Sequence, residues 1–109
     1  MTAFVLEGIV AAPVLPMLPD AGIDWPSLRS YIDWIAAQRP TAIAMNMDAS
    51  EGPSLDHDEQ LEVLRVCKEV IAGTVPLVSG LIAGSTRGAV RWGGELKAAG
   101  ADALAVFPP

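Results

Sequence analysis

Hydrophobic residues form four short runs along the chain that contain few polar positions: residues 8–15, 41–47, 75–81 and 103–107. Runs that are apolar on both faces are typical of parallel strands that other elements cover on both sides. Their starts lie about 30 residues apart, which is the length of one strand, one crossover helix and the connections between them. We therefore expect four parallel strands.

The stretches between these runs have the spacing of helices that pack on a sheet, with apolar residues at intervals of three and four. In the first stretch these residues are Leu28, Tyr31, Ile32, Ile35 and Ala36. In the second stretch they are Val63, Leu64, Cys67, Val70 and Ile71, and in the third Ala89, Trp92, Leu96 and Ala99. The predicted order is β-α-β-α-β-α-β.

Capping residues support the starts of these helices. Asp24 is a candidate N-cap for the first helix, and Asp56 with Glu59 three positions later forms a capping-box pattern for the second. Gly93 and Gly94 fall inside the third helix, where each costs about 1 kcal/mol relative to alanine. We expect the third helix to be the weakest of the three.

Composition and charge narrow the class of protein. The net charge of −6 and the scattered lysines and arginines argue against a nucleic-acid partner. No apolar run reaches membrane-spanning length and no signal sequence is evident, so we expect a soluble cytoplasmic protein with no membrane partner. Cys67 is the only cysteine and His57 the only histidine, so we assign no disulfide and no metal.

Three segments carry a family resemblance. Residues 8–17 read GIVAAPVLPM, residues 47–59 read MDASEGPSLDHDE, and residues 99–103 read AGADA before the closing FPP. The first and second resemble, respectively, the G-x-x-x-A-x-V-T-P-F/M strand and the G-T-T-G-E-x-x-x-L-x-x-x-E loop of the dihydrodipicolinate synthase / N-acetylneuraminate lyase family. The resemblance covers essentially the whole chain without an insertion.

Spacing alone fits either an open doubly wound sheet or half of a barrel, and the resemblance favours the barrel. It implies an α/β fold in which residues 1–109 supply the first four strands and three helices of a class I aldolase-type (β/α)8 barrel. It also implies a small-molecule keto acid or aldehyde substrate such as pyruvate, a lysine Schiff base, no cofactor, and a homo-oligomer.

The candidate substrate-binding residues that the resemblance implies are Ala12, Asp48, Ala49 and Ser50. In the family two threonines at the positions of Asp48 and Ala49 relay protons and hold the keto acid's carboxylate. An ionised Asp48 would repel that carboxylate by about 1 to 4 kcal/mol at close approach.

The loop residues have alternative roles. Asp48 is a candidate proton relay, or a loop aspartate that makes turn hydrogen bonds. Ser50 could supply the missing hydroxyl, and Glu51 is expected to organise the loop.

The family's Schiff-base lysine has no counterpart in these residues. Lys68 and Lys97 are the only lysines, and both fall on amphipathic helices outside the expected barrel mouth. Two hypotheses follow. In the first, the chain is the N-terminal part of a lyase or aldolase whose further strands lie beyond residue 109. In the second, it is a non-catalytic half-barrel that self-associates or pairs with another chain.

Overall fold

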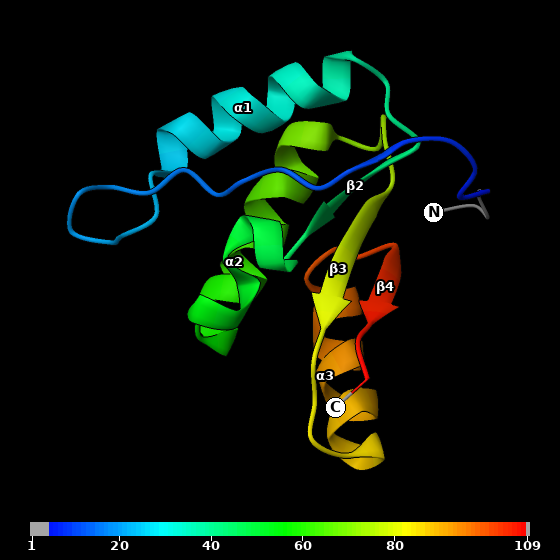
Figure 1. The fold of residues 1–109 in the computed structure, drawn as a ribbon. Coiled ribbons are helices and arrows are strands. Elements are labelled where there is room, and N and C mark those ends of the chain that lie inside the picture. The colour runs from blue at the N-terminus through cyan, green and yellow to red at the C-terminus, as the bar shows by residue number, and fades with distance from the viewer. Residues whose placement is uncertain (1–4, 109) are drawn as a thin grey trace.

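A computed structural model describes residues 5–108, which alternate between strands and helices (Figure 1). The longest helix has 15 residues, and none within the described range is both long and apolar enough to cross a membrane. The main elements in chain order are β1 (Val10–Ala11), α1 (Trp25–Ala37), β2 (Ala42–Met45), α2 (His57–Ile71), β3 (Leu77–Leu81), α3 (Thr86–Ala98) and β4 (Ala103–Val106).

The four strands form one parallel sheet in the order β1-β2-β3-β4, as expected (Figure 1). The register places Ile43 opposite Leu77 and Val78 opposite Ala103. β1 is shorter than the predicted run of residues 8–15. Pro13 lacks the N–H that would continue the ladder, so pairing with β2 stops at Ala11.

The predicted caps form at the starts of the helices. The Asp24 carboxylate accepts a hydrogen bond from the Ser27 amide at 3.2 Å at the start of α1. At the start of α2 the Glu59 amide donates to Asp56 at 2.8 Å, and the Asp56 amide donates back to the Glu59 side chain at 3.0 Å. This reciprocal pair is the predicted capping box, and it satisfies two backbone donors that the helix leaves free.

All three helices pack against one face of the sheet. On that face the large side chains of Ile43, Met45, Leu77 and Leu81 join one cluster with buried residues of each helix, among them Leu28, Ile32, Leu64, Cys67, Trp92 and Leu96. The other face carries a smaller cluster without helical members: Ala42, Ala44 and Val78, packed by Met47, Ala103 and Ala105. A doubly wound sheet has helices on both faces, so the arrangement confirms the barrel-type interpretation.

Apolar side chains remain exposed along both edges of the sheet. β1 pairs only with β2, and β4 only with β3. Ile9 is 77% exposed beside the first edge, and Val106 is 63% exposed on the second. Strand edges of this kind present free backbone donors and acceptors to further strands.

Candidate functional site

The connection from β2 to α2, residues 46–56, lies at the carboxyl end of β2 and is here called the Asp48 loop. It contains two short 3-10 turns, Asp48–Ser50 and Gly52–Ser54. In barrels of parallel strands, substrate and catalytic groups gather at the carboxyl ends of the strands. The Asp48 loop is therefore the candidate site, and it contains four of the five residues that the sequence singled out.

Ser50 holds the first turn together from inside. The Ser50 and Gly52 amides donate to the Met47 carbonyl at 3.1 and 3.0 Å. The Ser50 hydroxyl accepts from the Met47 amide at 2.9 Å and lies 3.2 Å from the Met47 carbonyl oxygen, to which it donates. Ser50 is only 1% exposed. Its hydroxyl is thus occupied within the loop, where it maintains the turn that presents the two preceding residues.

Asp48 and Ala49 occupy the exposed part of the turn. Among the hydrogen bonds formed by residues 5–108, none uses the backbone amide of Asp48 or Ala49, and none uses the Asp48 carboxylate. The Asp48 carbonyl accepts from the Glu51 amide at 3.2 Å, so the backbone of Asp48 takes part in the turn while its side chain does not. Two adjacent N–H groups and one carboxylate are therefore available to a ligand.

Glu51 is exposed and adopts a left-handed conformation, with φ of 61°. Its side chain takes part in none of the hydrogen bonds seen in the described part of the chain, and its organising role stays a prediction. The side chain that braces this part of the loop is Gln60, whose amide donates to the Gly52 carbonyl at 2.8 Å. The sequence analysis did not identify Gln60, because one polar residue on an amphipathic helix carries no distinguishing signal.

Asn46 is a second residue that the sequence analysis missed. It is 5% exposed and left-handed, with φ of 57°. Its side-chain amide donates to the Ser79 hydroxyl at 3.1 Å and to the Gln60 carbonyl at 3.3 Å. Within residues 5–108, Asn46 Oδ1 is the only buried side-chain nitrogen or oxygen without a hydrogen-bond partner. The available signal was that Asn46 and Ser79 are polar residues within apolar runs.

Two glycines give the Asn46 backbone its space. A Cβ atom at Gly52 or Gly80 would overlap the carbonyl oxygen of Asn46. The missing side chain at Gly80 allows the end of β3 to approach Asn46, and the missing side chain at Gly52 allows the loop to fold back onto Asn46. This close approach fixes where the Asp48 loop stands relative to β3.

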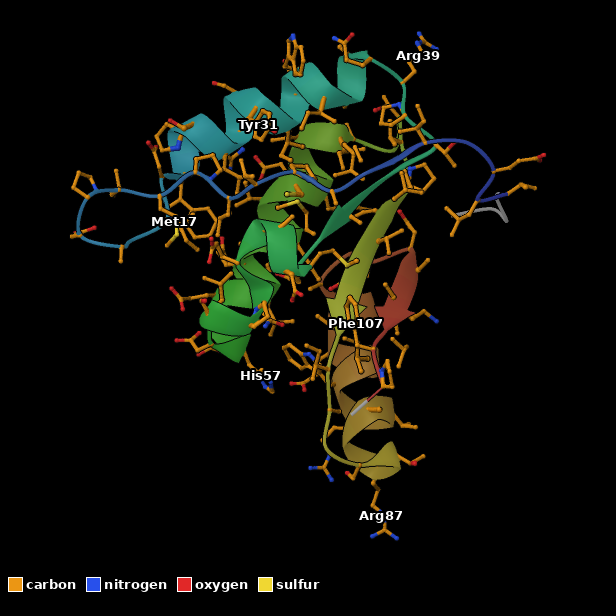
Figure 2. All side chains as sticks on the ribbon, in the orientation of Figure 1. Met17, Tyr31, Arg39, His57, Arg87 and Phe107 are labelled. Carbon is orange, nitrogen blue, oxygen red and sulfur yellow. The ribbon has the colours of Figure 1, made fainter. Side chains whose placement is uncertain are left out.

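A cavity of about 270 Å³ adjoins the buried side of the loop and includes Asn46, Gln60 and Gly80 in its walls. The His57 and Trp92 rings, which also line it, stack with centroids 3.8 Å apart and planes 13° apart. Figure 2 shows His57 at the end of α2 that lies nearest α3. The stack joins the start of α2 to the middle of α3.

Ala12 lies apart from this cavity. It is exposed directly after β1 and borders a hollow of about 520 Å³, whose other walls include Tyr31 and Trp34 of α1 and Thr41 directly before β2. This hollow is larger and more apolar than the cavity at the loop, but it lies toward the amino end of β2. The Asp48 loop, at the carboxyl end of β2, therefore remains the candidate site, and a substrate contact by Ala12 stays a prediction.

Both lysines lie away from the Asp48 loop. Lys68 is in the last turn of α2 and forms an ion pair with Asp102, which precedes β4. Lys97 is in the last turn of α3. In a βα repeat the end of a helix adjoins the amino end of the next strand, which is the side opposite the candidate site. The placement agrees with the prediction that neither lysine is a Schiff-base nucleophile.

Comparisons with known proteins agree on one family. A model described as the dihydrodipicolinate synthetase family matches residues 5–109. A 4-hydroxy-tetrahydrodipicolinate synthase from Leptothrix cholodnii is 38% identical over 104 residues, which cover 94% of this chain and 36% of that protein. The corresponding protein of Methylibium petroleiphilum is 39% identical over 104 residues, with coverage of 94% and 36%. The chain thus spans about a third of the length of these relatives.

Solved structures give the same result for the fold. A dihydrodipicolinate synthase from Acinetobacter baumannii, described as chloride inhibited and complexed with pyruvate, matches with a TM-score of 0.90 and 31% identity over 96% of this chain and 36% of that one. The synthase from Bacillus clausii matches with a TM-score of 0.84 and 31% identity, covering 93% and 34%.

Proposed function

Since the chain belongs to the dihydrodipicolinate synthetase family, we propose that the protein is a lyase or aldolase that acts on a 2-keto acid through a lysine Schiff base. The 109 residues would supply the first half of the barrel and one wall of the site. The observation that carries the proposal is the Asp48 loop, which follows β2 and leaves the amides of Asp48 and Ala49 free among the described residues.

Free backbone amides are suited to bind the carboxylate of a keto acid. Hydrogen bonds to an ionised acceptor are shorter and stronger than those between neutral groups, and two adjacent N–H groups supply them without a charged side chain. The Acinetobacter baumannii relative, whose structure contains pyruvate, is 31% identical to this chain. That relative supports a small 2-keto acid as the class of ligand.

The Schiff-base lysine is expected to come from residues beyond these 109. Lys68 is engaged by Asp102 at the far end of the sheet, and a lysine that forms an imine requires a free amine in a desolvated pocket. The exposed apolar edges at β1 and β4 would be covered by the remaining strands of the barrel. We further propose a cytoplasmic homo-oligomer, as the family resemblance implies.

The side chains of the loop depart from the family's motif, and this departure favours weak binding of pyruvate and a preference for a different carbonyl compound. Asp48 and Ala49 stand where the family's motif has two threonines, so one hydroxyl is replaced by a charge and the other by a methyl group. The Asp48 carboxylate is exposed and free of hydrogen bonds in the described part of the chain. It could transfer a proton to or from a bound carbonyl compound, and its charge disfavours a second carboxylate close by.

Trapping of the imine tests the proposal. Condensation of a lysine amine with pyruvate releases water and forms C=N. Borohydride then adds hydride to that carbon while the nitrogen takes a proton from water, leaving a stable secondary amine. We expect the product of the complete reading frame to gain one such adduct, located by mass spectrometry on a lysine outside residues 1–109. The 109-residue chain alone should gain none.

Two results would count against the proposal. The first is a complete gene product that forms no adduct with pyruvate or with other 2-keto acids. The second is a stoichiometric adduct on Lys68 or Lys97 of the 109-residue chain, which would place the reacting amine inside this segment.

A non-catalytic half-barrel that self-associates is the second candidate function, because the exposed edges could also pair with another copy. It predicts a stable dimer or larger assembly by light scattering, without imine formation.

A further inference from the structure

We propose that Asn46 is a positioning residue for the Asp48 loop, acting through Ser79 and Gln60 to set the amides of Asp48 and Ala49 at the distance that a keto-acid carboxylate requires. The inference rests on the proposed function, because it assigns a role toward that ligand. Asn46 itself does not touch the ligand in this proposal.

The hydrogen bonds of Asn46 join three elements at one point. Its Nδ2 donates to Ser79 on β3 at 3.1 Å and to the backbone carbonyl of Gln60 on α2 at 3.3 Å, while its own backbone directly follows the last residue of β2. The Ser79 hydroxyl donates onward to the Gly80 carbonyl at 3.0 Å. A buried amide with both donor bonds made has one orientation, so the peptide that leads into Asp48 is held in one place.

Gln60 extends this connection to the far end of the turn. Its side chain donates to the Gly52 carbonyl at 2.8 Å, and its carbonyl accepts from Asn46. The turn that carries Asp48 and Ala49 lies between Asn46 and Gly52 and is therefore anchored at both ends by one polar network. The two exposed residues of the turn make no side-chain hydrogen bonds of their own within residues 5–108, so their placement depends on these anchors.

The backbone of Asn46 explains why this residue type is suitable. A φ of 57° is a left-handed conformation that asparagine and glycine tolerate better than other residues. Glycine would keep the backbone but lose both side-chain hydrogen bonds, whereas asparagine supplies both. The variant Asn46→Gly thus separates the hydrogen bonds from the backbone conformation.

The test uses the product of the complete reading frame and measures borohydride trapping over a series of pyruvate concentrations. For Asn46→Gly we expect the half-saturating pyruvate concentration to rise about tenfold, because small displacements of binding groups have large effects on a bound ligand. Ser79→Ala should cause a smaller rise in the same direction. The trapping rate at saturating pyruvate should stay close to that of the wild type, since the reacting lysine lies elsewhere.

Thr74→Ala is the matched control. It also removes one side-chain hydrogen bond, from Thr74 to the Ile71 carbonyl at 2.7 Å, but at the amino end of β3. It should leave the half-saturating concentration unchanged. The double variant Asn46→Gly with Ser79→Ala should be no worse than Asn46→Gly alone, because the Ser79 contact is already lost. If Asn46→Gly does not fold, Ser79→Ala provides the comparison.

The outcomes separate this inference from the proposed function. If the wild type forms the adduct and both variants saturate at the wild-type concentration, the positioning role is wrong and the proposed function stands. Equal changes in the variants and in Thr74→Ala would also overturn it, since they would indicate general loss of stability. A wild type that forms no adduct overturns both.

Discussion

The ammonium group of Lys68 lies 2.9 Å from each carboxylate oxygen of Asp102. The same carboxylate accepts the backbone N–H of Leu77 at 2.9 Å. The Asp102 side chain is 7% exposed and the Lys68 side chain 35%. One acidic side chain therefore connects the end of α2 to the starts of β3 and β4, on the side of the sheet opposite the Asp48 loop.

Removal of Asp102 should destabilise the fold more than removal of an exposed ion-pair partner. Asp102→Ala leaves a mostly buried amide without its acceptor and an ammonium without its partner, and we expect a loss of about 2 to 3 kcal/mol in the free energy of unfolding. Glu69→Ala, which removes an exposed pair with Arg29, should cost about 0.5 kcal/mol or less. Urea denaturation measures both, and equal effects would contradict the role assigned to Asp102.

Cys67 should be unreactive in the folded protein. It is fully buried in the core between the helices and the sheet, and burial raises the pKa of its thiol from 9.0 to about 12. Below pH 9 the thiol is protonated in both the folded and the unfolded states, so its contribution to stability does not change with pH. Between pH 9 and 12 only the unfolded state loses the proton, and the free energy of unfolding falls by about 1.4 kcal/mol per pH unit.

The measurement for Cys67 is the rate of alkylation by iodoacetamide at pH 8, with and without urea. We expect labelling only under unfolding conditions. A Cys67→Ala variant should lose the thiol's part of the alkaline destabilisation when unfolding is followed between pH 9 and 11. Rapid labelling of the native protein would show that the cysteine is accessible.

Alanine substitutions at Gly80 and Gly94 should change the free energy of unfolding in opposite directions. A Cβ at Gly80 would overlap the Asn46 carbonyl, whereas a Cβ at Gly94 on α3 would have no atom within 4 Å apart from those of its chain neighbours and the adjoining helix backbone. Gly94→Ala should raise the free energy of unfolding by about 1 kcal/mol, because glycine is a poor helix former. Gly80→Ala should lower it by about 1 to 3 kcal/mol, since the strand or the loop must shift. A neutral Gly80→Ala would mean that the loop moves freely.

The features of the fold that depend on residues close together in the chain could be predicted from the sequence. Helical spacing and the capping pairs depend on residues at most a few positions apart, so the three helices were predicted, and the N-caps of the first two with them. The shared spacing of the βα units similarly indicated parallel strands. The length of β1 was overestimated, because an apolar run does not reveal which of its residues have a partner strand.

The polar network of the site depends on residues far apart in the chain. Asn46 meets Ser79 across two neighbouring strands, 33 positions later, and that contact follows from the strand register rather than from any local pattern. The motif resemblance located the loop at residues 47–59, but it indicated neither the buried hydroxyl of Ser50 nor the bracing by Gln60. Those depend on how the turn folds back onto α2 and β3.

Restoring the threonines of the family's motif should improve binding of a keto acid. In the product of the complete reading frame, Ala49→Thr returns one hydroxyl to the exposed part of the turn, and we expect pyruvate affinity to increase by about 1 kcal/mol, the net value of one hydrogen bond. Asp48→Thr removes the charge near the carboxylate and should add a further gain. The double variant should exceed either single change, and the sum can deviate because the positions are adjacent.

Equilibrium Kd values for pyruvate, measured by calorimetry for the parent, both single variants and the double variant, test this argument. Ser54→Thr, an exposed change in the second turn of the loop, is the control and should leave the Kd unchanged. A parent that binds pyruvate as tightly as the double variant would contradict the prediction. In that case the backbone amides of Asp48 and Ala49, which are already free in the described part of the loop, would suffice to bind the carboxylate. The Asp48 side chain would then have to point its charge away from the ligand.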